Sequence, residues 1–119
     1  MRNEKDNLII KLSLEFALLV IEYTELLEDN KKFVISRQLL KSGTSIGANV
    51  REAQNAESKA DFIHKMKIAA KEADETDYWL TLCEVSDNYP KAEHLSEKLK
   101  SIMNILSKII SSSKSSKTD

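Results

Sequence analysis

The chain has 119 residues, enough for one hydrophobic core and too few for two. It is 41% hydrophobic and 31% charged, with a net charge of −1, a balance that suits a globular protein and gives no bulk electrostatic case for nucleic-acid binding. It contains only two Gly and one Pro, so turn-forming residues are scarce and long helices are favoured over sheets.

An apolar stretch over residues 8–21 begins the chain, but Lys11 and Glu15 interrupt it. A signal peptide needs an uninterrupted apolar centre and a membrane span needs about 20 apolar residues, so the stretch indicates neither. Cys83 is the one cysteine, which excludes an internal disulfide and fits a reducing compartment. We therefore expect a cytoplasmic protein with no membrane contact.

Apolar residues recur at steps of three and four through the first segment, which predicts a helix over residues 4–28. The row expected to face the core is Ile9, Leu12, Phe16, Leu19, Tyr23 and Leu26. A second apolar row lies largely opposite and consists of Ile10, Leu14, Ala17 and Ile21. The polar residues 29–32 are expected to turn the chain.

A second helix is predicted over residues 33–54, with Ser36, Leu39, Gly43, Ile46, Val50 and Ala53 on its inner side. Both glycines of the chain, Gly43 and Gly47, fall within it. Glycine inside a helix costs about 1 kcal/mol relative to alanine, so two glycines four residues apart indicate that something packs close to this backbone. The alternative is a break at residues 42–45, and we favour a continuous helix.

A third helix is expected to begin after Ser58, because Ser58 and Asp61 resemble a capping box with Asp in place of Glu. Its inner row is Phe62, Met66, Ala69, Ala73, Thr76, Leu80 and Cys83, and its end is expected near residues 87–89. Tyr78, Leu82 and Val85 lie opposite the last part of this row, with Trp79 to one side. Pro90 is predicted to be the first residue of the next helix, where no amide donor is needed.

The fourth helix carries an inner row of Ala92, Leu95, Leu99, Ile102, Leu106 and Ile109. Residues 111–119 are rich in Ser and Lys and lack an apolar anchor, so they are expected to form a disordered tail. Residues 1–110 are then one domain, an all-α antiparallel up-down-up-down four-helix bundle.

The second apolar faces of the first and third helices need a cover, since every helix of a four-helix bundle keeps an outer face. Self-association is the simplest cover, and the alternative is that these residues broaden the monomer core. The expected interface is Ile10, Leu14, Ile21, Tyr78, Trp79, Leu82 and Val85. Because the two faces belong to different helices, a head-to-tail contact that closes into a ring is feasible.

Charge alternates along the chain: residues 1–30 and 68–90 are mainly acidic, and residues 31–67 and 91–119 mainly basic. One interpretation is attraction between the edges of neighbouring helices, and the other is a basic face that meets an acidic partner. The basic residues that could contact phosphates are Arg37, Lys41, Arg51, Lys59, Lys65 and Lys67. No aromatic residue is interleaved with them for base stacking.

The sequence offers little evidence for a catalytic or metal-binding site. Di-metal bundles use Glu-x-x-His pairs, and the nearest feature is a single pair, Asp61 and His64. Cys83 lies on a core row without a nearby histidine, and the acidic set Glu72, Asp74, Glu75 and Asp77 is expected to be a solvated face. We expect no catalytic, metal or cofactor site and no small-molecule substrate; a small enzyme or metal-binding bundle that uses core or acidic-face residues is the alternative.

Three stretches, residues 36–40, 43–53 and 62–69, together with Lys71, Glu72, Glu75 and Thr76, resemble the bacterial "four helix bundle protein" family, also known as the 23S rRNA intervening-sequence proteins. The resemblance covers roughly residues 16–106 and is most specific at Ser45, Ile46, Asn49, Val50, Glu52 and Ala53. Many members have proline near Gly47 and glycine at Ala53, and this chain resembles the subgroup that reads Gly-Thr-Ser-Ile-Gly-Ala-Asn.

The resemblance implies a homopentamer without established enzymatic activity, some members being encoded within insertions in large-subunit rRNA genes. A similar bundle, the accessory protein of diversity-generating retroelements, binds reverse transcriptase and nucleic acid, but that relative is strongly basic and this chain is not. From the residues and the resemblance together we expect a non-enzymatic homo-oligomeric scaffold or binding module. Its expected partners are copies of itself and an RNA, ribosomal RNA included, or a nucleic-acid-handling protein.

Overall fold

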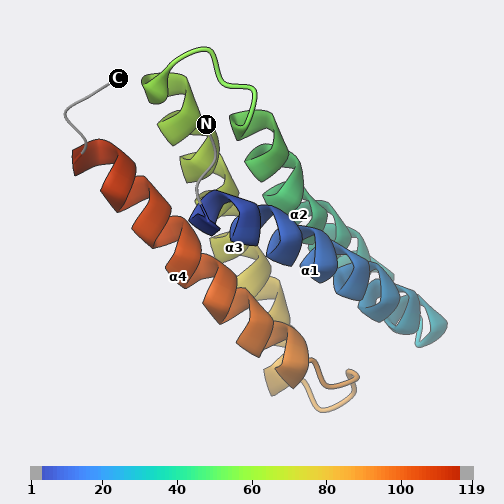
Figure 1. Ribbon diagram of the computed structural model, residues 1–119. Coiled ribbons are helices and arrows are strands. Elements are labelled where there is room, and N and C mark those ends of the chain that lie inside the picture. The colour runs from blue at the N-terminus through green and yellow to red at the C-terminus, as the bar shows by residue number, and fades with distance from the viewer. Residues whose placement is uncertain (1–3, 116–119) are drawn as a thin grey trace.

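The computed structural model describes residues 4–115, which form four antiparallel helices (Figure 1). They are α1 (Glu4–Asp29), α2 (Phe33–Ala53), α3 (Lys59–Val85) and α4 (Glu93–Ser115). Each helix packs on the next one in the chain, and α4 closes the bundle against α1. The start of α1, the end of α4 and the α2–α3 connection lie at one end of the molecule. The predicted all-α up-down-up-down bundle is confirmed.

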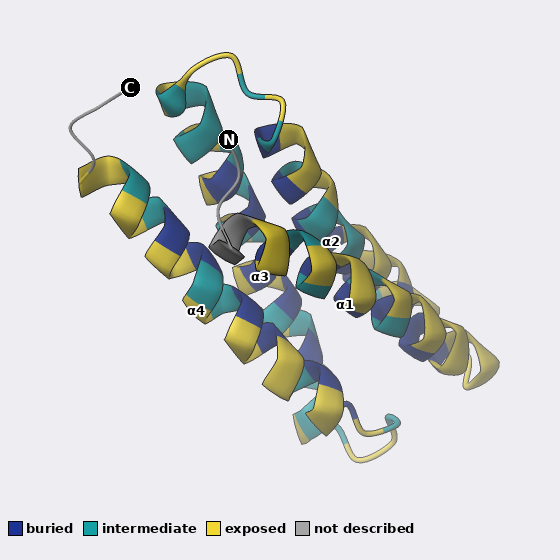
Figure 2. Cartoon of the chain, viewed as in Figure 1, coloured by how far each residue is buried: buried dark blue, intermediate teal, exposed yellow. Residues whose placement is uncertain are grey.

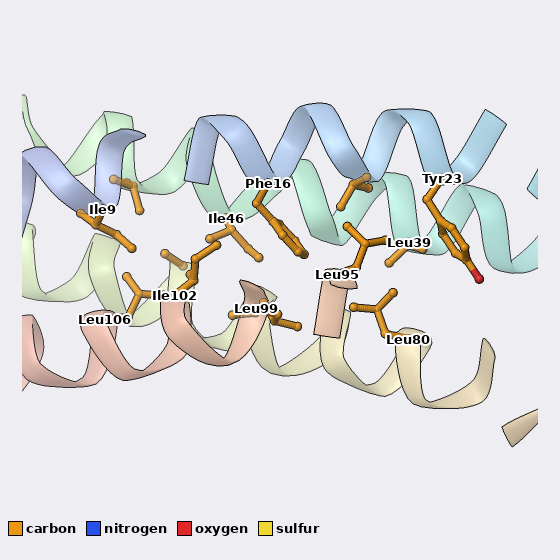
Figure 3. Close-up of a cluster of buried hydrophobic side chains, with 14 of the residues drawn as sticks. Ile9, Phe16, Tyr23, Leu39, Ile46, Leu80, Leu95, Leu99, Ile102 and Leu106 are labelled. Carbon is orange, nitrogen blue, oxygen red and sulfur yellow. The ribbon is translucent and has the colours of Figure 1, made fainter. Parts of the chain in front are cut away.

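Aliphatic side chains from all four helices fill the interior, and Figure 2 shows the buried and exposed positions alternating around each helix. In Figure 3, Ile9 and Phe16 of α1 point towards the row formed by Leu99, Ile102 and Leu106 of α4. The predicted inner rows of α2 and α4 are buried throughout, and that of α3 is buried except for the half-buried Phe62. Among residues 4–115, no helix is long and apolar enough to cross a membrane.

The inner row predicted for α1 was partly wrong. Leu26 is 44% exposed, whereas Val20 and Leu27 are completely buried. Leu12 and Leu19 are only half-buried and pack at the edge of the core. The error has a simple cause: α1 is apolar over most of its circumference, so steps of three and four can be traced along more than one row.

The α1–α2 connection reverses the chain at the predicted polar residues. The amides of Lys31 and Lys32 donate to the carbonyls of Glu28 and Leu27 (2.9 and 2.8 Å), the two bonds of a Schellman motif. Lys31 takes the left-handed position, with φ of 62°. Glycine usually occupies this position, because its missing Cβ removes the steric cost.

The structure corrects the start of α4, which is Glu93 rather than Pro90. The Pro90 carbonyl accepts a hydrogen bond from the Tyr23 hydroxyl, and the Ala92 amide donates to the Glu84 carboxylate (2.9 Å). The Ala92 carbonyl then accepts the first hydrogen bonds of the helix. These bonds keep Pro90 in the connection. The α3 helix also ends earlier than predicted, at Val85, because Ser86 takes an extended conformation.

The N-terminus of α3 is capped as predicted: Ser58 Oγ accepts a hydrogen bond from the Asp61 amide (3.0 Å). The carboxylate of Asp61 accepts in return from the amide of Glu57 (3.2 Å). At the same end of the bundle, α4 continues beyond residue 110 to Ser115, so residues 111–115 of the predicted tail are helical. Residues 116–119 of that tail lie outside the described residues.

The α2 helix runs unbroken through both glycines, as favoured by the sequence. Gly43 marks the close approach of α1, because a Cβ added there would lie 2.9 Å from both methyl carbons of Val20. A Cβ added at Gly47 would lie 3.4 Å from the carbonyl oxygen of Ser13, an ordinary contact. The close packing inferred from the two glycines is therefore located at Gly43.

We predict opposite effects for alanine at the two glycines. Gly43→Ala should lower the free energy of unfolding by about 1–2 kcal/mol, because overpacking against the stiff Val20 side chain outweighs the gain in helix propensity. Gly47→Ala is the matched comparison and, in the monomer, should raise it by up to about 1 kcal/mol. Urea unfolding at one fixed protein concentration measures both; equal effects at the two sites would show that the α1–α2 contact is not tight at Gly43.

Candidate functional site

The bundle interior offers no reactive constellation in the described residues. No group of three His, Cys, Asp or Glu residues there could hold a metal ion, and every buried side-chain nitrogen or oxygen has a hydrogen-bond partner. Ser42 and Thr76, for example, share a hydrogen bond of 2.9 Å between α2 and α3. His64 and His94 are exposed, and the acidic set of α3 includes Glu75, whose carboxylate accepts from Trp79 Nε1 (3.2 Å). No specific observation favours the enzyme or metal alternative.

Cys83 and Tyr23 form a buried pair near the α3–α4 connection. Cys83 is completely buried, and Tyr23 is 4% exposed with its hydroxyl donating to Pro90. Burial raises the pKa of the Cys83 thiol above its ordinary value of 9.0, and burial together with the adjacent Cys83 raises the pKa of Tyr23 above 10.0. Both groups are therefore neutral near neutral pH, and the pair acts as packing rather than as a nucleophile.

The raised pKa values predict a loss of stability at alkaline pH. The unfolded chain gives up both protons at a lower pH than the folded chain does, so the stabilisation is complete below about pH 9 and declines above it. Urea unfolding at pH 7 and at about pH 10.5 measures the decline. The Cys83→Ala/Tyr23→Phe variant should lose less stability between the two pH values than the natural chain; an identical loss would contradict the assignment.

A surface groove runs between α1 and α2 on the outside of the bundle, with a volume of about 570 Å³. Its apolar walls come from Ile10, Leu14 and Ala17 of α1, and its α2 side is formed by small residues such as Gly47 and Ala48. The other residues that line it are Ser13, Thr44, Val50, Arg51 and Gln54. Leu14 is 62% exposed, and Ile21, two turns further along α1, is 39% exposed. We call this surface the α1–α2 groove.

A second apolar surface projects from the C-terminal half of α3. Tyr78 and Val85 are 58% and 72% exposed, and Leu82 and Trp79 are half-buried. The rings of Tyr78 and Trp79 meet edge to face, with 5.2 Å between their centroids. We call Tyr78, Trp79, Leu82 and Val85 the α3 ridge. All seven predicted interface residues are thus fully or partly exposed on the monomer, although Ile10 and Trp79 also pack against the edge of its core.

The two surfaces differ in charge. Every charged residue of α3 from Glu72 to its end is acidic, including Asp74, Glu75 and Asp77 beside the ridge. Among the described residues that line the α1–α2 groove, Arg51 carries the charge, and it is exposed. An apolar ridge flanked by acidic residues and an apolar groove bordered by Arg51 carry opposite charge.

The structure does not bring the six predicted phosphate contacts together. Arg37 and Lys41 are exposed on the first half of α2, and Arg51 is roughly 21 Å from Arg37 along the helix axis. Lys65 is held by Glu52 in an ion pair of 3.0 Å, which raises the pKa of Lys65. Lys59 and Lys67 lie at the α3–α4 side of the bundle. There Lys67 lies near Lys114, which belongs to the segment predicted to be a disordered tail.

Comparison with known proteins agrees with this architecture. The family model described as "23S rRNA-intervening sequence protein" matches residues 5–112. The chain belongs to this family. A crystal structure of a protein of unknown function from the S23 ribosomal protein family of Bacteroides thetaiotaomicron VPI-5482 is 44% identical, with a TM-score of 0.85. That match covers 90% of this chain and 98% of the other. None of the curated proteins matches the chain.

The family model spans all four helices, so the groove, the ridge and the lysines of the α3–α4 side all belong to the matched region except Lys114. The sequence did not predict part of the groove. Thr44 and Ala48 of α2 line it, but neither belongs to a row of apolar residues spaced by three and four. Sequence reasoning also missed Lys114, because a Ser- and Lys-rich segment gives no indication that its helix continues.

Proposed function

We propose that this 23S rRNA-intervening sequence family member is a non-enzymatic scaffold that assembles with copies of itself. The observation that carries the proposal is the pair of unlike apolar surfaces on one monomer, the α1–α2 groove and the α3 ridge. Large apolar side chains exposed in contiguous patches usually mark an interaction surface. No cofactor or small-molecule substrate enters the proposal.

The ridge of one copy is proposed to enter the groove of the next. The Tyr78 ring and the Leu82 side chain supply bulk, and the small residues Ala17, Gly47 and Ala48 leave room for it. The acidic side chains beside the ridge would then approach Arg51 of the next copy, which favours this pairing over ridge against ridge. Burial of the four ridge side chains would supply most of the binding free energy.

A contact between two different surfaces is heterologous, so successive copies are related by a rotation that either closes into a ring or continues as a filament. The family resemblance implies five copies, and we propose a closed pentamer on that ground. In such a ring no groove or ridge would remain uncovered, and the outer charged faces of the helices would stay available to a further partner.

Two variants with one altered surface each test the head-to-tail pairing. Leu14→Glu blocks the groove and Tyr78→Glu blocks the ridge, and both residues are exposed in the monomer, so folding should survive. Each variant alone should run as a monomer in size-exclusion chromatography with light scattering. Mixed in equal amounts they should form a dimer, because each retains the surface that the other has lost.

Leu26→Glu is the control, because Leu26 is also an exposed leucine of α1 but lies outside the groove lining. It should assemble like the natural chain. If Tyr78→Glu left assembly intact while Leu14→Glu abolished it, the contact would be groove against groove, and the heterologous pairing would be wrong. Failure of the mixture to form a dimer would contradict it equally.

A further inference from the structure

A second groove lies between α3 and α4 on a different side of the bundle from the α1–α2 groove. It has a volume of about 380 Å³ and is lined by Ala70 of α3 together with five residues of α4, Met103, Ser107, Ile110, Ser111 and Lys114. Ser107, Ser111 and Lys114 follow one another at steps of four and three, so they share one face of α4. In the described part of the chain, no hydrogen bond to another residue engages the hydroxyls of Ser107 and Ser111.

Two lysines lie beside this groove. Lys114 lines it, and Lys67 lies one turn before Ala70 on the same face of α3, near Lys114. The neighbouring charge of Lys114 lowers the pKa of Lys67, as expected when two cations are held together. Among the described residues, neither lysine has a carboxylate partner, in contrast to Lys65 with Glu52. The packing of α3 against α4 therefore places two lysines without an ion pair to any described residue beside this groove.

Lys114 also lines an adjoining depression at the N-terminus of α3, with Glu57, Ser58, Lys59, Ala60 and Ile63. Lys114 thus lies between two neighbouring depressions along the same edge of the bundle. Lysines and hydroxyls in a row are the groups that contact successive phosphates of a nucleic-acid backbone. The apolar lining of the groove offers no aromatic ring for base stacking, so such contacts would carry no sequence preference.

We propose that Lys67, Lys114, Ser107 and Ser111 form a binding site for the phosphate backbone of a nucleic-acid strand, in the groove between α3 and α4. The site goes beyond self-assembly and does not depend on it, because Lys67 is roughly 16 Å from Tyr78 along α3 and lies outside the α1–α2 groove. The chain as a whole carries a net charge of −1, so affinity must come from these local contacts and not from long-range attraction.

Fluorescence anisotropy with a labelled single-stranded oligouridine, titrated at several salt concentrations, tests the site. Each phosphate contact on a single strand contributes a slope of about −0.7 to log K against log salt concentration. The Lys67→Gln/Lys114→Gln variant should therefore have a slope that is shallower by about 1.4, and at about 50 mM salt its affinity should fall roughly fiftyfold.

The control is Lys98→Gln/Lys108→Gln, which removes the same charge from two α4 lysines outside both depressions. It should bind almost as the natural chain does. Equal weakening in both double variants, or no binding by the natural chain, would overturn the proposal. Both double variants should assemble to the same mass in solution as the natural chain. A loss of oligonucleotide binding can therefore be distinguished from a loss of self-assembly.

Competition and NMR distinguish a nucleic-acid strand from free phosphate. The oligonucleotide should shift the amide resonances of Ser107 and Ser111, and inorganic phosphate at the same total phosphate concentration should leave the complex intact. If inorganic phosphate displaced the oligonucleotide at that concentration, the site would be one for a free anion. If the shifts appeared only at Arg37, Lys41 and Arg51, the strand would bind on α2 and the proposed site would be wrong.

Discussion

Burial of aliphatic rows between four helices leaves each helix with an outer face, and on α1 and α3 that face is apolar. Leu14, Tyr78 and Val85 are exposed on these faces. Contact of large apolar side chains with water has an unfavourable free energy, so this arrangement destabilises the monomer. Covering these side chains lowers this free-energy cost, and it requires another layer of structure against the outer faces of α1 and α3. The proposed assembly supplies that layer from copies of the same chain.

Small residues of α2 both allow close packing on α1 and line the α1–α2 groove. The missing side chain of Gly43 lets Val20 approach α2, and this close packing fixes the spacing between α1 and α2. One turn away, Gly47 and Ala48 line the groove between the same two helices, opposite Ala17. Close helix packing and the α1–α2 groove therefore come from one run of small residues on α2. On the α3–α4 side, interhelical packing instead brings Lys67 to Lys114, and the same bundle geometry creates a charged surface.

Periodicity predicted most of the fold, because in α2 and α4 one row of apolar residues stands out from polar neighbours and in α3 a regular row at steps of three and four runs the length of the helix. It was less reliable in α1, where leucines surround the helix and Leu26 could not be distinguished from Leu27 by spacing alone. The position of Pro90 depended on the bond from Tyr23, a contact between residues far apart in sequence that no local pattern encodes. The ridge was predicted as a surplus of apolar residues, whereas the groove and the Lys67–Lys114 pair required knowledge of which faces of neighbouring helices meet.

Sedimentation equilibrium of the natural chain over a wide range of protein concentrations tests the central claim most directly, since it measures whether the apolar outer faces are covered by further copies. The account predicts a particle several times heavier than the 13.5 kDa chain, with five copies as the expected number. A mass of 13.5 kDa at every concentration would show that Leu14 and Tyr78 remain in contact with water, and it would contradict the account.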